Sequence, residues 1–322
     1  MANKINTVFP EGFAGEKKEF LKDTLPDLYD AMKTGAILQE KVVGIEKIDG
    51  KDALVVFFNQ NIKGIIFEEE AGLRPKEKLH YLVGTMVNFK VKHIDRQNNI
   101  VYLSRKEALE KMSGITWETL IKDAQKMLEV YKIIQKKKEE YRKAKEIGDK
   151  VRMQELYNEI NKLTEKMESL GPVRTCVVKH VTDRVAYVDI GGITATLPRR
   201  EVSWGYVDDV RNYIQTGDSF DVRVIFFDKD TGYVEVSIKQ LLPDPWGYVP
   251  DKYNEGGLYV GKLVKIFPKG LLIEFEPAVM CMVPHLPYGN PNEGSELLVK
   301  LTKIDQDERK MYGYVVKVVK KV

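Results

Sequence analysis

The sequence contains very little cysteine and no long apolar segment. Cys176 and Cys281 are the only cysteines in 322 residues, and they lie far apart without a C-x-x-C pair. This argues against a disulfide framework or a zinc site and favours a reducing compartment. No apolar run approaches the roughly 20 residues that a membrane-spanning helix needs, and the N-terminus lacks the apolar stretch of a signal peptide. We therefore expect a cytoplasmic protein with no membrane partner.

Motifs of common catalytic sites are also missing. The sequence has no Walker loop, no G-x-S-x-G segment and no H-E-x-x-H pair. Its four histidines are scattered along the chain, at His80, His93, His180 and His285. We expect no enzyme activity, no bound metal and no cofactor.

Charge of one sign does not dominate. The chain has 51 Lys+Arg against 48 Asp+Glu, for a formal net charge of +3, although 31% of its residues are charged. A nucleic-acid-binding protein often carries a clear positive excess, so any basic surface here has to be local.

Proline is absent between Trp117 and Leu170, and Gly148 is the only glycine there. Apolar residues recur in steps of three and four, which predicts an amphipathic helix with one buried stripe. Gly148-Asp149 has the composition of a C-cap followed by an N-cap. The segment is either two antiparallel helices or one long helix with a weak point, and the caps favour the hairpin.

On either side of this segment, short runs rich in Val, Ile, Tyr and Phe alternate with Gly, Asp and Asn turns. One pattern occurs three times: a glycine, an alternating strand, an Asp eleven residues after the glycine, and a second strand. The glycines are Gly84, Gly217 and Gly294, and the aspartates are Asp95, Asp228 and Asp305. Each copy predicts a β-hairpin.

The spacing of the glycines shows where the helices fit. Gly217 to Gly294 spans 77 residues, whereas Gly84 to Gly217 spans 133, an excess of 56. This excess nearly equals the length of the helical stretch. The helices are therefore an insertion between the first and second repeats.

Further strand-like runs lie upstream of each hairpin. They include ILQEKVVGIEKI in the first repeat and TCVVKHVT, RVAYVDI and ITATLP in the second. Five strands of this length suit an OB-type barrel, a small closed sheet that hides its edges. We predict a mainly β chain with three tandem five-stranded OB barrels and a helical hairpin or coiled coil. The predicted segments are an N-terminal helical lead-in (1–34), barrels at 35–115, 171–246 and 247–322, and the helical segment at 116–170.

The second repeat carries a family likeness. RVAYVDIGG at residues 184–192 resembles the S1-domain signature, in which an aromatic residue, Val and Asp precede a paired-Gly turn. EVSW at 201–204 resembles the stretch that follows strand three in that family. VSIKQLLPDPW at 236–246 is similar to the segment that closes S1 domains in bacterial ribosomal protein S1. The chain is therefore similar to the S1 RNA-binding domain family, most clearly in repeat two.

The resemblance implies that one barrel face binds RNA. In the family, rings on strands two and three stack bases, and nearby basic side chains meet phosphates. In the second repeat, Tyr187 holds the strand-two aromatic position, and Arg199 and Arg200 follow strand three as candidate sources of charge. Tyr233 stands at the strand-five position where family members often have Arg. Pro198 stands where family members often have His.

The other two repeats match this pattern less well. The first offers Phe57 and Phe67, with Val55 at the strand-two aromatic position. The third offers Lys310 and His285, while Leu272 replaces the strand-two ring. No repeat keeps the whole set, so we expect weak binding distributed over the tandem domains.

Three functions remain open, and the first two come from different classes of protein. The first is an RNA-binding protein whose partners are single-stranded RNA or mRNA, with the ribosome as a further partner that the resemblance raises. The second is a structural or assembly protein that uses S1 barrels for protein contacts, with self-association or a partner protein at residues 116–170. A third is an accessory subunit of an RNA-processing enzyme.

Overall fold

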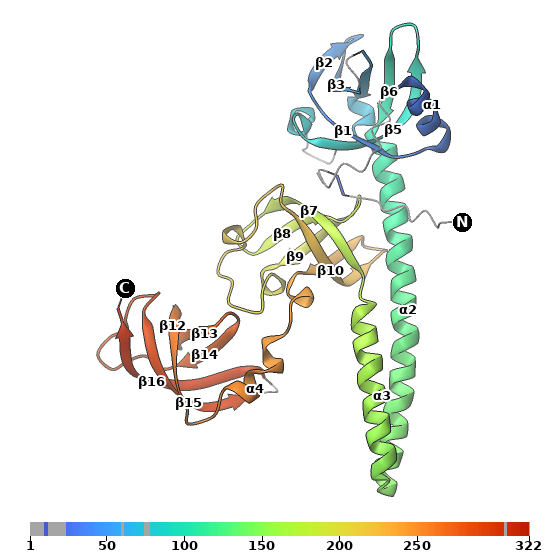
Figure 1. Cartoon of the computed structure of the whole chain (residues 1–322). Coiled ribbons are helices and arrows are strands. Elements are labelled where there is room, and N and C mark those ends of the chain that lie inside the picture. The colour runs from blue at the N-terminus through green and yellow to red at the C-terminus, as the bar shows by residue number, and fades with distance from the viewer. Residues whose placement is uncertain (1–9, 12–23, 59–60, 74–77, 306–307, 322) are drawn as a thin grey trace. The chain divides into compact units, whose positions relative to one another are not determined.

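A computed structural model describes residues 10–11, 24–58, 61–73, 78–305 and 308–321 (Figure 1). Within these ranges the strands form three sheets, and a long helical segment separates the first sheet from the second. The prediction of a mainly β chain with a helical insertion is confirmed. The three predicted hairpins are present as β5–β6, β10–β11 and β15–β16.

The first sheet has the strand order β1-β5-β6-β4-β3-β2. Every pair is antiparallel except β4–β6, which is parallel. The strands are β1 (Leu38–Lys41), β2 (Gly44–Ile48), β3 (Lys51–Phe57), β4 (Lys63–Phe67), β5 (Met86–Asp95) and β6 (Ile100–Ser104).

The run expected to form one strand before β3 is divided into β1 and β2. The Val42 N–H donates to the Thr85 carbonyl at 2.9 Å, whereas the next N–H, of Val43, donates to the Val55 carbonyl at 2.8 Å. Consecutive residues thus bond to opposite neighbours. The chain changes its pairing partner here, so β1 joins β5 and β2 joins β3.

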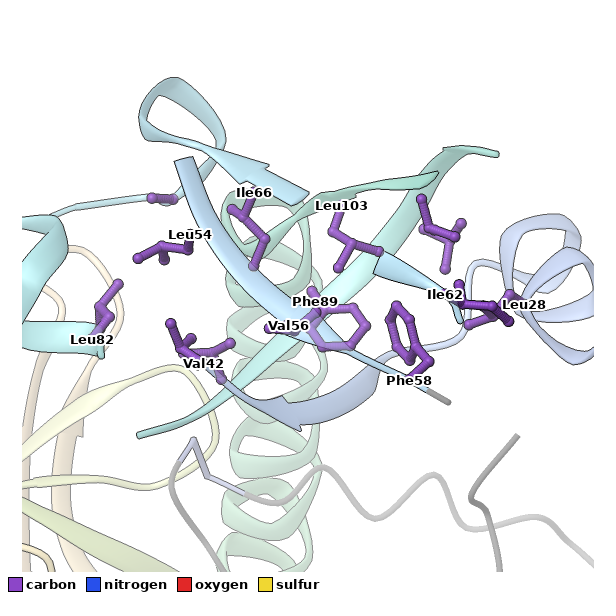
Figure 2. Close-up of a cluster of buried hydrophobic side chains, with 14 of the residues drawn as sticks. Leu28, Val42, Leu54, Val56, Phe58, Ile62, Ile66, Leu82, Phe89 and Leu103 are labelled. Atoms are coloured by element: carbon purple, nitrogen blue, oxygen red, sulfur yellow. The ribbon is translucent and has the colours of Figure 1, made fainter. Parts of the chain in front are cut away.

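Alternation along the strands builds the core of the first sheet (Figure 2). Leu54, Val56 and Phe58 point inward, and Phe89 is fully buried against them. Helix α1 (Leu25–Thr34) adds Leu28 to the same cluster. Part of the predicted N-terminal lead-in is thus helical, while residues 1–9 and 12–23 lie outside the described residues.

The helical segment consists of α2 (Arg105–Ile147) and α3 (Lys150–Ser169), which lie side by side and run antiparallel (Figure 1). Gly148 ends α2 in the left-handed conformation, at φ 78°, so the predicted C-cap is confirmed. Across the hairpin, Lys137 pairs with Glu159 and Arg152 with Glu140. In the described part of the chain, no helix combines the length and apolar character needed to cross a membrane.

Helix α2 begins earlier than the predicted boundary at residue 116. The Ser104 hydroxyl accepts a hydrogen bond from the Glu107 N–H at 3.0 Å, which caps the helix directly after strand β6. Gly114 lies within the helix, where it lowers helix propensity without breaking it. The helix therefore continues the last strand of the first sheet with no loop between them.

The second sheet is a closed barrel in the order β10-β11-β9-β8-β7. Inward side chains such as Val188, Val234 and Val236 are almost completely buried. The strands are β7 (Val173–Val181), β8 (Val185–Asp189), β9 (Thr194–Pro198), β10 (Ser219–Asp228) and β11 (Tyr233–Ser237).

The third sheet is a closed barrel in the order β12-β13-β14-β16-β15. Before it, the Asp244 carboxylate accepts from the Trp246 N–H at 3.0 Å, and the Trp246 ring packs against the core of this barrel. The strands are β12 (Leu258–Phe267), β13 (Gly270–Glu276), β14 (Val279–Val283), β15 (Glu296–Asp305) and β16 (Lys310–Lys320).

Each closed barrel holds one free cysteine in its core. Cys176 on β7 and Cys281 on β14 are fully buried, and burial raises the pKa of each thiol to about 12. Because the thiolate is the reactive species, we expect labelling with iodoacetamide at pH 8 to be about a thousandfold slower in the folded protein than in urea. Mass spectrometry of labelled peptides measures this for each barrel. Fast native labelling at one cysteine would mean that its barrel opens.

Candidate nucleic-acid interface

Tyr187 presents its ring on the outside of the second barrel. It is 38% exposed, whereas its strand neighbours Ala186 and Val188 are fully buried. Across the β7–β8 ladder it faces His180, and the two rings stack with centroids 6.2 Å apart and planes 19° apart. His180 was missed by sequence reasoning because its ring is brought to Tyr187 only by the strand register.

A second pair of exposed rings lies on β10 and β11 of the same barrel. Phe226 is 54% exposed and Tyr233 is 43% exposed, with centroids 6.0 Å apart. The Tyr233 hydroxyl donates to the Glu235 carboxylate at 3.0 Å and lies 3.2 Å from the Thr196 hydroxyl on β9. Strand β9 lies between β8 and β11. Tyr233 was predicted as a site residue, while Phe226 was not.

The two predicted arginines follow β9 directly. Both are exposed, and Nη1 of Arg199 donates to the Asp208 carbonyl at 2.8 Å. Nε of Arg200 lies 3.7 Å from the Glu201 carboxylate. They line a pocket of about 290 Å³ whose walls are Arg199, Arg200, Ser203, Trp204, Gly205, Tyr206, Val207 and Lys239.

The Trp204 ring in this pocket lies close to two cations. Lys239 Nζ lies 5.2 Å and the Arg309 guanidinium 5.4 Å from the ring centroid, and Arg309 also pairs with Asp244 at 2.8 Å. The Trp204 Nε1 donates to the Leu242 carbonyl at 3.3 Å. Residues 198–213 and 237–322 belong to one compact unit. These contacts give Trp204 a structural role, fastening the segment after β9 to the third barrel.

The paired-glycine turn of the signature is also structural. The buried Asp189 carboxylate accepts from the N–H groups of Gly191 and Gly192, both at 2.8 Å. Burial raises the pKa of Asp189. Thr116 on α2 donates to the Gly191 carbonyl at 2.8 Å, so the turn is packed against the helix and unavailable to a ligand.

In the first sheet, the strand-two aromatic position offers no ring. Val55 occupies it and is only 2% exposed, and the cross-strand residue Ile65 is 1% exposed. Phe57, two residues further along β3, is 46% exposed and faces Lys63 across the β3–β4 ladder. Phe57 is therefore accessible, but it has only a lysine as cross-strand neighbour.

Phe67 belongs to a row of three stacked rings. It lies 6.1 Å from Tyr102 with planes 17° apart, and Tyr102 lies 5.9 Å from His93 with planes 27° apart. Lys51 Nζ lies 6.0 Å from the Phe67 ring centroid. The rings come from β4, β6 and β5, of which β5 and β6 form one hairpin and β4 lies earlier in the sequence. Tyr102 and His93 were missed because the alternation of one strand does not show which rings meet across strands.

The third barrel has an outward row without a paired stack of rings. Cross-strand register joins Lys265, Leu272, Met282, Tyr312 and Lys303 in this order. Both lysines are neutralised, Lys265 by Glu293 at 3.3 Å and Lys303 by Asp305 at 2.6 Å.

The two predicted residues of the third barrel are also engaged in local contacts. Lys310 pairs with Glu308 at 2.9 Å. His285 is exposed and contacts the Pro268 carbonyl at 3.2 Å and the Asn290 side chain at 2.8 Å. The structure thus does not bring Lys310 and His285 together with a pair of exposed rings.

The aspartate that recurs in all three repeats has a common structural role. Its carboxylate accepts a backbone N–H of the following loop: Gln97 for Asp95, Asp230 for Asp228 and Glu308 for Asp305. Hydrogen bonds to Asn98, Thr231 and Lys303 lower the pKa of the three aspartates. Among the described residues, no group of three or more His, Cys, Asp or Glu could hold a metal ion.

The exposed ring pairs and the closed barrel define a small β-barrel of the OB class with an aromatic outer face. Residues 169–239 match the family "S1 RNA binding domain", so the second barrel is an S1 domain. The chain as a whole resembles bacterial ribosomal protein S1. It is 23% identical over 311 residues to small ribosomal subunit protein bS1 of Pseudomonas aeruginosa, an alignment that covers 94% of this chain and 48% of that protein.

Other relatives have different names. The chain is 31% identical over 160 residues to "4-hydroxy-3-methylbut-2-enyl diphosphate reductase" of Clostridium acetobutylicum, covering 47% of this chain and 24% of that protein. Among solved structures, GSP13 from Bacillus subtilis is 26% identical to this chain, with a TM-score of 0.22. The match covers 23% of this chain and 58% of the GSP13 chain. The chain spans about half or less of the length of these curated relatives.

Proposed function

We propose that this chain binds single-stranded RNA through the second barrel, with the rings of Tyr187 and His180 as a stacking platform for bases. The observation that supports this most directly is an exposed, stacked pair of rings on the outer face of an S1 domain. Every base has an aromatic face, so stacking on such rings tolerates many sequences. Phe226 and Tyr233 extend the platform, because β8, β9, β11 and β10 are consecutive neighbours in the barrel.

Charge indicates how strong this binding should be. Residues 173–246 contain nine Lys+Arg and eleven Asp+Glu, and the Tyr233 hydroxyl is bonded to Glu235. Few phosphate contacts give a shallow dependence of affinity on salt. We therefore propose weak binding by the second barrel, strengthened when linked modules hold one strand, because linkage raises the effective concentration.

The setting of this binding is also a proposal. The similarity to small ribosomal subunit protein bS1 over 94% of this chain supports mRNA and the ribosome as partners in the cytoplasm. We propose that the first sheet follows the same OB plan as the two closed barrels, with domains at 35–115, 171–246 and 247–322. The reductase-named relative shares only 24% of its length, and we propose no enzyme activity for this chain.

Replacing Tyr187 with alanine should weaken RNA binding about 5- to 150-fold, since one base–ring stack contributes roughly 1–3 kcal/mol. The measurement is fluorescence anisotropy of a labelled oligouridine across a salt series, with the full chain. Tyr288→Ala is the matched control, because Tyr288 is fully exposed on the third barrel. No binding by the unmodified chain at low salt would refute the proposed function.

Assembly through protein contacts is the second candidate. Two observations favour it. In the first sheet a buried valine, Val55, occupies the position of the stacking ring, and in the third barrel Lys265 and Lys303 are neutralised by carboxylates. The hairpin of α2 and α3 offers a site for self-association or for a partner protein. Sedimentation equilibrium of the full chain distinguishes the two, since a concentration-independent monomer mass would leave the hairpin without a self-association role.

A further inference from the structure

The third barrel carries a second outer surface on β12, β15 and β16. It is separate from the row that runs from Lys265 to Lys303, which corresponds to the face with the stacked rings in the second barrel. Cross-strand register places Leu258 beside Lys300 and Tyr314, and Val260 beside Leu298 and Lys317. We call this surface the β12–β15–β16 face. It lies within one compact unit of the chain.

Its centre is apolar and exposed. Leu258 is 55% exposed, Val260 and Val316 are 49% exposed, and Tyr314 is 44% exposed. Single apolar residues on a surface are ordinary, but a contiguous group of them usually marks a binding site.

Two irregularities in the β15–β16 ladder enlarge this apolar surface. Leu298 pairs with Lys317 and Val299 with Val315, so Val316 is an extra residue on β16. A second shift leaves Val319 as another extra residue, and it is 47% exposed. Bulges of this kind redirect side chains and are common beside functional sites. Here both add an aliphatic side chain to the exposed surface.

The charged side chains on this face are four lysines and one carboxylate, Glu296. Within the described residues, Lys262, Lys300, Lys317 and Lys320 have no carboxylate within 4.0 Å. Glu296 pairs in register with Lys262 and Lys320, but not within ion-pair distance. On the row that corresponds to the stacking face, by contrast, Lys265 and Lys303 are each held by a carboxylate. Four lysines of the β12–β15–β16 face are thus available to a ligand, whereas the two on the other row are not.

We propose that the β12–β15–β16 face binds an acidic, apolar segment of a partner protein. The four lysines complement carboxylates, and complementary charge steers association and selects partners. The exposed centre is mainly aliphatic, with Tyr314 as its one ring among the residues named above. Stacking of bases requires rings, whereas aliphatic side chains bury well against Leu, Ile or Phe of a polypeptide. The inference does not depend on RNA binding by the second barrel.

The geometry specifies the segment further. Across the three strands, one row reads Leu258, Lys300 and Tyr314, and the next reads Val260, Leu298 and Lys317. A helix with one apolar stripe flanked by Asp or Glu would cover the centre and bring carboxylates to the lysines. Lys300 lies between Leu258 and Tyr314 in register, whereas ion pairs of Lys262, Lys317 and Lys320 would lie at the edges of the face. Salt should therefore weaken the association mainly by slowing it.

Selection of 16-residue peptides from a displayed random library against the full chain tests this proposal. We expect the enriched peptides to combine Asp or Glu with Leu, Ile or Phe and to carry a net negative charge. A synthetic copy of one enriched peptide should slow hydrogen exchange in β12, β15 and β16 when it binds. Enrichment of basic or neutral peptides, no enrichment, or protection elsewhere on the chain would overturn the proposal.

Matched variants sharpen the test. Lys300→Glu combined with Lys317→Glu should weaken peptide binding about tenfold or more, and Val260→Ser with Val316→Ser should also weaken it without altering charge. Lys269→Glu with Lys303→Glu makes the same charge change on the same barrel and should have little effect. If the Lys300/Lys317 variant instead lowers oligouridine binding and leaves peptide binding unchanged, the face binds RNA and the proposal is wrong. Tyr187→Ala should leave peptide binding unchanged.

Discussion

Replacing Arg105 with methionine should lower the free energy of unfolding of the first sheet by about 3–5 kcal/mol. The Arg105 guanidinium forms two hydrogen bonds of 2.7 Å with the two carboxylate oxygens of Glu11. Only 7% of the Arg105 side chain and 4% of the Glu11 side chain are exposed. Arg105 also donates to the Ala71 carbonyl at 2.6 Å. Methionine fills the space but leaves a buried carboxylate and a buried carbonyl without this donor.

The double variant Arg105→Met with Glu11→Leu separates the ion pair from packing. Without Arg105, the Glu11 carboxylate keeps the Asn88 N–H at 3.2 Å and Lys179 Nζ at 3.9 Å but loses its two shortest hydrogen bonds. Removing one partner of a buried pair is costly, whereas removing both is often close to neutral. We therefore expect the double variant to recover much of the lost stability. The three tryptophans, Trp117, Trp204 and Trp246, lie outside the first sheet, so peptide-level hydrogen exchange over β3 to β6 is the suitable measurement. A loss below about 1 kcal/mol for Arg105→Met would mean that water reaches the pair.

Phe89→Ala should cost about 3–5 kcal/mol in the same sheet. Phe89 is fully buried and meets Phe58 edge to face, with centroids 5.6 Å apart and planes at 76° (Figure 2). Removing this ring leaves a cavity in the middle of the core, and the lost contacts add to the lost transfer free energy.

Phe57→Ala is the matched control for Phe89→Ala. Phe57 lies on the same sheet but is 46% exposed, so its loss should change stability by about 0.5 kcal/mol or less. Hydrogen exchange of the β5 peptide gives both values. Equal losses for the two variants would contradict the division of the sheet into an inner and an outer face.

Local patterns predicted the elements of this chain well. The recurring Gly and Asp of each repeat identified the hairpins, because a strand pair needs a turn and the Asp carboxylate binds the loop N–H groups. Gly148 identified the end of α2, because the left-handed conformation favours glycine. The paired-glycine signature identified the S1 domain, which the family match over 169–239 confirms.

The start of α2 and the division of β1 from β2 were not predicted. Ser104 ends a strand and caps a helix at the same time, and a local pattern gives no sign that one residue does both. Val42 and Val43 are identical neighbours that bond to strands on opposite sides. Both features depend on which distant strand is adjacent.

The alternation of strands, the helical insertion and the S1 signature can be read from the sequence, because they depend on side-chain period and turn chemistry within a few residues. Which rings meet and which lysines are neutralised depends instead on the folded arrangement of the strands. Tyr187 joins His180, and Phe67 joins Tyr102 and His93, because the register between neighbouring strands decides which side chains face each other. Val55 is buried, and Lys300 keeps a free charge between exposed Leu258 and Tyr314, because burial and pairing are set by neighbours across the sheet.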